Sequence, residues 1–144
     1  MVKVFISYSS IDKSFVRKLS NDISANGIDI WLDQNNIKPG DSIVSKINKG
    51  LCESDFTLLV ISSYFLKSEW AIWESNWATN NSISKKRTSV IPILIEDVWN
   101  DVSPLLRDKK YLDFRSHQNL LVYRSSLAEL VSTILVTNEE IISK

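Results

Sequence analysis

The chain has 144 residues, of which 44% are hydrophobic and 24% are charged, and these proportions are typical of a soluble globular protein. A chain of this length is expected to form one domain. Its 17 basic and 17 acidic side chains give a formal net charge of zero. This balance argues against binding driven by the charge of nucleic acid or of an anionic membrane.

The amino-terminal residues read as a strand and not as a secretory signal, and we find no apolar run of the length that a membrane span requires. A cytoplasmic location is therefore expected. The last residues look like a fraying tail. We accordingly expect one domain over residues 1–137 and a C-terminal tail over residues 138–144.

Five short segments carry the β-branched and aromatic residues that are typical of strands. They span residues 2–8, 28–33, 56–61, 89–95 and 110–114. The third segment is almost continuously apolar, which indicates a central strand covered on both faces. In the second, Ile28, Ile30 and Leu32 alternate with other side chains and predict one buried face. Pro92 removes a ladder donor from the fourth and predicts a position near the sheet edge or at a bulge.

Helical patterns separate these strands. The first helix would begin at a cap formed by Ser10 or Asp12 and end at Asn26-Gly27. Others follow the turn at Pro39-Gly40 and the serine pair 62–63, where Ser68 is a further candidate cap, and the last spans residues 119–136.

The alternation of strand and helix predicts an α/β domain, because each parallel crossover needs a helix. For five strands, a flavodoxin-like parallel sheet of order 2-1-3-4-5 with helices on both faces is expected. Ligands of such sheets bind outside the carboxyl ends of the strands, beside the switch between strands 1 and 3. Residues 8–10, 62–63 and Asp33 would meet there.

A stripe of tryptophans lies just after the third strand. Trp70, Trp73, Glu74 and Trp77 are spaced i, i+3, i+4 and i+7, so a helix would place all four on one side. By themselves, tryptophans at this spacing usually pack a core and a helix glutamate is usually solvated. The position beside the predicted crevice makes Glu74 a candidate chemical group.

Four segments in chain order resemble a Toll/interleukin-1 receptor (TIR) domain. They are residues 4–9 (VFISYS), 31–33 (WLD), 37–42 (IKPGDS) and 70–74 (WAIWE). The likeness extends from about residue 2 to about residue 136. It implies the flavodoxin-like fold described above. It also implies one of two functions, since some TIR domains cleave NAD+ and others only assemble with further TIR domains.

The enzymatic interpretation assigns roles to residues that match the family's motifs. Glu74 matches the glutamate on which enzymatic members depend, and Trp70 would stack on nicotinamide. Asp33 would accept a hydrogen bond from a ribose hydroxyl, and Ser7, Tyr8 and Ser9 would contact the rest of the dinucleotide. The resemblance implies NAD+ as substrate, no cofactor, and anti-phage signalling of the bacterial type, in which a downstream effector senses the nucleotide product.

Some positions depart from the family's pattern. Ala71 replaces a cysteine that many members carry, and Ser9-Ser10 replace basic residues of some enzymatic members. The chain also lacks a glycine-rich phosphate cradle, so phosphate binding has to come from elsewhere.

The second interpretation is a binding module that scaffolds signalling by self-association. Residues Ile37, Pro39, Gly40 and Asp41 would form its assembly loop. Both interpretations can hold together, because enzymatic members tend to need assembly before they cleave NAD+. A third interpretation, a response-regulator receiver, is rejected, because the first and third strands end in serines and tyrosine where a receiver needs acidic residues.

Other kinds of site are not expected. Cys52 is the only cysteine, so no internal disulfide can form, and its apolar surroundings favour core packing. His117 is the only histidine and stands in a polar segment without an evident partner. We therefore expect neither a metal site nor a catalytic triad with His117 as its base.

Overall fold

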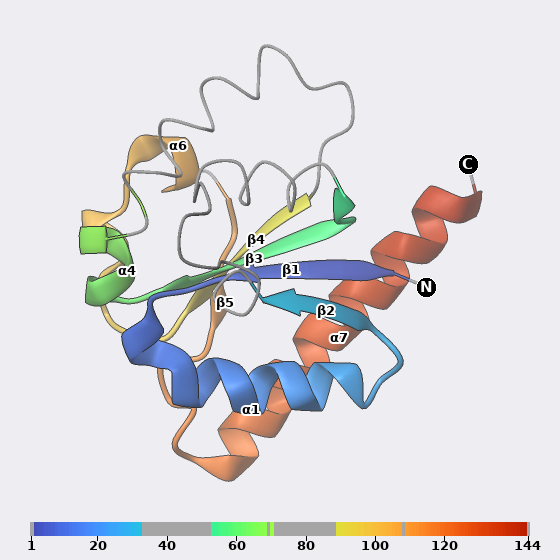
Figure 1. Ribbon diagram of the computed structural model, residues 1–144, viewed down its shortest axis with the longest axis horizontal. Helices are drawn as coiled ribbons and strands as arrows, with labels where there is room; N and C mark the ends of the chain where they lie inside the picture. Colours follow the sequence, from blue (N-terminus) through green and yellow to red (C-terminus); the bar gives the residue numbers. More distant parts are fainter. Residues whose placement is uncertain (1, 33–52, 69, 71–88, 108, 144) are drawn as a thin grey trace, which may run out of the picture.

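A computed structural model describes residues 2–32, 53–68, 70, 89–107 and 109–143 (Figure 1). Five parallel strands form one sheet of order β2-β1-β3-β4-β5, which confirms the predicted order. The strands are β1 (Lys3–Ser7), β2 (Asp29–Leu32), β3 (Phe56–Ile61), β4 (Ser89–Leu94) and β5 (Leu112–Asp113). The flavodoxin-like α/β class expected from the alternation of elements is therefore present.

Helices cover both faces of the sheet (Figure 1). The longer ones are α1 (Lys13–Ser24) and α7 (Leu120–Ser143), and the shorter ones are α4 (Ser63–Ser68) and α6 (Pro104–Arg107). Two 3-10 turns, η1 (Ser10–Asp12) and η2 (Trp99–Asp101), join them to the strands. The helix predicted to follow the Pro39-Gly40 turn, which would carry Ile43, Ile47 and Leu51, lies outside the described residues.

The period-two alternation of the strands divides the core into two clusters. Val4, Ile6 and Tyr8 of the β1 segment pack with α1 and α7, whereas Phe5 packs on the opposite face with residues of α4 and α6. In β2, Ile30 and Leu32 join the first cluster, while Trp31 joins the second. The expected alternation in the second strand is thus confirmed. All six residues of β3 are buried, as predicted for a central strand.

Pro92 is accommodated where β4 has a partner on one side only. Its register with β3 is unbroken and sets Pro92 opposite Leu59, while β5 pairs only with Ile93 and Leu94. The missing N–H therefore faces the side that β5 does not reach, and the expectation of a position near the edge is confirmed.

The helix α1 ends as the sequence predicts. The backbone N–H groups of Asn26 and Gly27 donate to Ile23 and Ser24, and Gly27 adopts a φ of +78°. Glycine populates this left-handed region without the penalty that a Cβ imposes.

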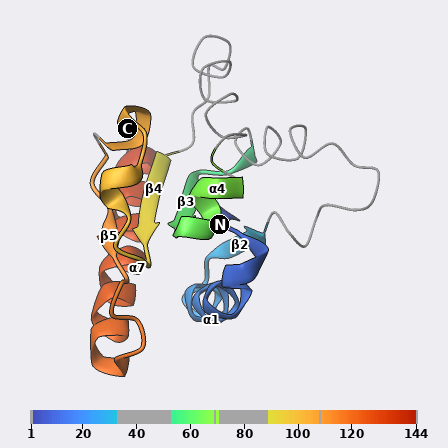
Figure 2. The same ribbon diagram turned by 90° about the vertical axis from the view of Figure 1, so that its left-hand side faces the viewer.

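The last helix is longer than expected. It continues to Ser143, past the predicted end at residue 136. The sequence from residue 120 onward contains no glycine or proline that would end a helix. Figure 2 shows α7 running alongside β5 and β4.

The hydropathy of α7 also corrects an expectation. The window Leu120–Thr137 has a mean hydropathy of 1.4, enough for a membrane span by length and composition, and 17% of it is buried. A stripe of Tyr123, Leu130 and Ile134 nevertheless packs into the core. One such helix is weak support for a membrane span, because core helices pass the same test. The helix α7 is attached to the sheet by this stripe, as a core helix is.

Candidate functional site at the carboxyl edge of the sheet

Polar side chains gather where β1, β3 and β4 end. Asp12 follows β1, Ser62 and Ser63 follow β3, and Glu96 follows β4. In Figure 1 these strand ends converge beside the start of α4. This edge, next to the switch in strand order between β1 and β3, is where a sheet of this kind binds ligands.

Ser62 joins the loop after β1 to the start of α4. Its Oγ donates a 2.5 Å hydrogen bond to Oδ2 of Asp12 and accepts a 3.1 Å bond from the N–H of Phe65. The second bond is that of a helix N-cap, which satisfies a donor that the first turn leaves without an intrahelical partner. The sequence prediction that Ser68 is a cap is not supported, since Ser68 lies within α4 and its hydroxyl donates to Tyr64 O at 2.8 Å.

Glu96, in the loop after β4, forms hydrogen bonds to Ser63, the first residue of α4. Its Oε1 accepts from the backbone N–H of Ser63 at 3.3 Å and from Ser63 Oγ at 3.2 Å. A carboxylate is favoured at this position because the first turn of a helix presents N–H donors. The beginning of α4 is thus bonded to residues that follow β1 and β4, the two strands that flank β3.

Asp12 and His117 influence each other's protonation. Burial raises the pKa of Asp12, as does the charge of Glu96, while the Ser62 hydrogen bond and His117 oppose the shift. Burial lowers the pKa of His117, helped by Lys18 and opposed by Asp12. Its ring packs on Phe15 with 4.7 Å between centroids. Folding therefore packs His117 against Phe15 and leaves it within electrostatic influence of Asp12.

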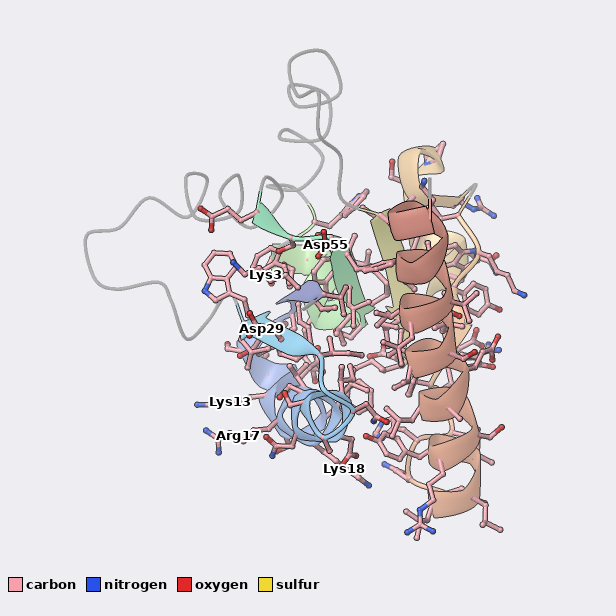
Figure 3. All side chains as sticks on the ribbon, turned by 90° about the vertical axis from the view of Figure 1, so that its right-hand side faces the viewer. Lys3, Lys13, Arg17, Lys18, Asp29 and Asp55 are labelled. Atoms are coloured by element: carbon pink, nitrogen blue, oxygen red, sulfur yellow. The ribbon has the colours of Figure 1, made fainter. Side chains whose placement is uncertain are left out.

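Lys18 occupies the side of α1 that faces α7. Its Nζ lies 4.3 Å from the centroid of the Tyr123 ring. Figure 3 shows Lys18 leaving the helix toward α7, whereas Lys13 and Arg17 project away from it. The Tyr123 hydroxyl donates a 2.5 Å bond to Asp22 Oδ2, so α1 and α7 are linked by polar as well as apolar contacts.

The predicted substrate contacts that follow the first strand are buried. Ser7, Tyr8 and Ser9 are 0%, 1% and 4% exposed, and Ser9 Oγ accepts from the N–H of Ile11. Trp70 is 6% exposed and belongs to the cluster that contains Phe65. These four side chains are buried, and their contact with substrate stays a prediction.

The other predicted site residues lie outside the described part of the chain. They are Glu74, Asp33 and the assembly-loop residues Ile37, Pro39, Gly40 and Asp41. Sequence reasoning considered Asp12 only as a helix cap and did not single out Glu96. A usable signal existed, because an acidic residue follows each of two strands whose carboxyl ends must adjoin the serine pair.

Comparison with known proteins identifies the family. Residues 4–127 match the family described as TIR domain. The chain belongs to the TIR domain family. The TIR domain of a Toll-related receptor from Hydra magnipapillata superposes with a TM-score of 0.66 at 22% identity, covering 89% of this chain and 96% of that one. This likeness bears on the fold alone.

Bacterial TIR proteins are more similar in sequence. The chain is 34% identical over 114 residues to the 2' cyclic ADP-D-ribose synthase AbTIR of Acinetobacter baumannii, covering 76% of this chain and 42% of that protein. It is 34% identical over 110 residues to the NAD(+) hydrolase PdTIR of Paracoccus denitrificans, covering 74% and 36%. The match therefore spans less than half the length of these relatives.

Proposed function

We propose that this TIR domain cleaves NAD+ at the nicotinamide–ribose bond, with Glu74 as the catalytic carboxylate. The observation that carries the proposal is the 34% identity to a 2' cyclic ADP-D-ribose synthase and to an NAD(+) hydrolase. The spacing of Trp70 and Glu74, one helical turn apart after the central strand, supports the assignment of the residue. Glu74 is assigned from the sequence, since it lies outside the described residues.

The chemistry explains why one carboxylate suffices. Nicotinamide is bonded to ribose as a cationic pyridinium, so it leaves as a neutral molecule with the electron pair of the broken bond and needs no acid. An ordinary glycosidase needs a second carboxyl group to protonate its leaving oxygen. The ribose gains positive charge at C1′, and an ionised Glu74 would stabilise that charge. The oxygen of water then bonds to C1′ and its proton passes to solvent, which gives ADP-ribose.

The acceptor decides the product. If a hydroxyl of the same dinucleotide replaces water at C1′, a cyclic ADP-ribose isomer forms and the hydroxyl proton is released. Relatives named for each outcome are equally similar to this chain, at 34% identity. The proposal therefore covers the class of NAD+ nucleosidases.

We extend the proposal to context on the strength of the resemblance to bacterial TIR proteins. The domain would act in the cytoplasm, in anti-phage defence, and would self-associate through the loop containing Ile37, Pro39, Gly40 and Asp41. Its nucleotide product would be sensed by a downstream effector.

The test is NAD+ consumption by the purified chain, in dilute solution and clustered on beads through a terminal tag. Wild type is expected to release nicotinamide, and to release it faster when clustered. Glu74→Ala and Glu74→Gln are each expected to lower kcat at least about 100-fold, as removal of a charge-stabilising group does. Glu69, the other carboxylate of this segment, precedes Trp70 and lies off the Trp70–Glu74 stripe in a helical arrangement. Glu69→Gln is therefore the matched control and should stay within about threefold. Chromatography of the products separates ADP-ribose from its cyclic isomers.

Two results would contradict the proposal. Clustered wild type that leaves NAD+ intact would exclude the enzymatic function, and both Glu74 variants at full rate would exclude Glu74. If wild type is inactive yet forms concentration-dependent oligomers that Pro39→Ala or Gly40→Ala disrupts, the domain is a non-enzymatic TIR–TIR interaction module.

A further inference from the structure

The start of α4 is bonded to the segments that follow two strands, β1 and β4. Asp12, after β1, accepts a 2.5 Å hydrogen bond from Ser62 Oγ. This serine oxygen itself accepts a bond from the N–H of Phe65. Glu96, after β4, accepts from the N–H and Oγ of Ser63. Residues that follow the two strands flanking β3 therefore fix the first turn of the helix that follows β3.

The carboxylate of Asp12 is not used in the way its position suggests. Asp12 is the N-cap residue of α1, where an aspartate normally bonds a first-turn N–H. Within the described residues it forms no such side-chain bond to α1. Its hydrogen bond instead crosses 50 positions of sequence to Ser62. Stabilisation of α1 alone therefore does not explain an acidic residue here.

The helix that Asp12 fixes leads toward the proposed catalytic segment. Phe65 of α4 and Trp70 belong to one buried cluster with residues of β1 and β3. Glu74 follows Trp70 by four positions in the sequence. A displacement of the first turn of α4 would be transmitted to Trp70 through this packing, because close-packed clusters do not deform continuously.

We propose that Asp12, acting through Ser62, is a positioning residue for the NAD+ cleavage proposed above. It holds the beginning of α4 against the loop after β1, and so sets the place of Trp70. This inference rests on the proposed function for its effect on catalysis. Its structural part, the fixing of α4, does not depend on that function.

The groups that face Asp12 come from the segments that follow three strands, β3, β4 and β5. Ser62 donates to it, Glu96 contributes a negative charge from the loop after β4, and His117 lies on the segment after β5. Lys18 of α1 acts on His117 in turn. Because Glu96 is also a carboxylate, Asp12→Asn removes repulsion while it keeps an oxygen that can accept from Ser62.

The experiment compares Asp12→Ala, Asp12→Asn, Ser62→Ala and the double variant Asp12→Ala/Ser62→Ala, with Tyr123→Phe as matched control. Tyr123→Phe also removes a 2.5 Å hydrogen bond to an aspartate, but that bond links α1 to α7. We expect Asp12→Ala to lower kcat for NAD+ by about 10-fold to 100-fold with KM within about threefold, as for a misplaced catalytic group. Asp12→Asn and Tyr123→Phe should stay within about threefold of wild type.

The double variant tests whether Asp12 acts through Ser62. Coupled residues give non-additive effects, so kcat of the double variant should equal that of Ser62→Ala alone. A further loss of about 10-fold in the double variant would show that Asp12 acts by another route and would overturn the inference. Equal losses in Asp12→Ala and Tyr123→Phe would likewise overturn it, because they would mark a general loss of stability.

Amide hydrogen exchange separates this inference from the proposed function. In Asp12→Ala we expect faster exchange over residues 63–68, and in Tyr123→Phe unchanged exchange there. Unchanged exchange in Asp12→Ala would overturn the positioning role whatever the activity. A wild type without NAD+ cleavage would refute the proposed function and the effect on kcat, while faster exchange in Asp12→Ala would still establish that Asp12 fixes α4.

Discussion

The Oγ of Ser62 lies 2.5 Å from Oδ2 of Asp12, although 50 positions separate these residues in the chain. A hydroxyl that donates to a carboxylate forms one of the stronger hydrogen bonds in proteins, and here the same hydroxyl also caps α4. The bond links the loop after β1 to the helix after β3 at the edge where sheets of this class bind ligands. Several consequences of the structure can be measured without any assumption about catalysis.

Ser62→Ala should lower the free energy of unfolding by about 2 kcal/mol. The variant loses the N-cap bond to Phe65 and leaves the Asp12 carboxylate without its hydroxyl donor. Chemical denaturation followed by circular dichroism measures this. Ser68→Ala, on the same helix, removes only an exposed bond to Tyr64 O and should cost less than about 0.5 kcal/mol. Equal losses in the two variants would argue against the special role of Ser62.

Replacement of His117 by glutamine should flatten the pH dependence of stability just below pH 6.5. Folding lowers the pKa of His117, so in this window the unfolded chain binds more protons and the native protein loses stability as pH falls. The raised pKa of Asp12 has the opposite sign, since in its own window the native state binds more protons and gains stability on acidification.

Denaturation curves at pH values between about 5 and 8 give the slope for wild type and for His117→Gln. His117 is the only histidine, so no other imidazole contributes to the slope. An unchanged slope in the variant would mean that the pKa of His117 does not shift on folding.

Gly27→Ala should destabilise the protein by about 1 kcal/mol through the backbone alone. Gly27 has a φ of +78°, and a Cβ added there would meet no atom within 4 Å. Gly27→Asn should cost less, because asparagine tolerates the left-handed region better than alanine does. Thermal unfolding of the two variants provides the comparison, and a neutral Gly27→Ala would contradict the assigned conformation.

Truncation of two neighbouring apolar residues of α7 should cost very different amounts of stability. Ile134 is 0% exposed and packs into the core, so Ile134→Ala is expected to cost about 2–5 kcal/mol. Leu135 is 37% exposed, and Leu135→Ala should cost less than about 1 kcal/mol. The difference in the free energy of unfolding tests how α7 is rotated on the sheet. A larger loss for Leu135→Ala would show that the other face of the helix is buried.

Much of the fold could be predicted because its signals are local. The apolar run of β3, the alternation in β2 and the stop at Gly27 each follow from a few consecutive residues. The end of α7 could not be placed, since polar residues suggested a tail although nothing in the sequence breaks the helix. The candidate site was predicted less completely. Glu74 and Trp70 were proposed from helical spacing, and their roles stay predictions. Asp12, Glu96 and His117 have partners that no short window of sequence identifies, because these partners are distant in the chain.

The sequence by itself determined the order of strands and helices, the burial of the central strand and the family to which the chain belongs. These properties depend on periodicity and on motifs, which are readable within short windows. Only the tertiary structure decided that Asp12 bonds Ser62 and not its own helix, that Glu96 holds Ser63, and that His117 lies beside Phe15. The physical reason is that a parallel sheet brings the ends of distant strands to one edge, where the nearest partner is set by strand order and not by sequence distance.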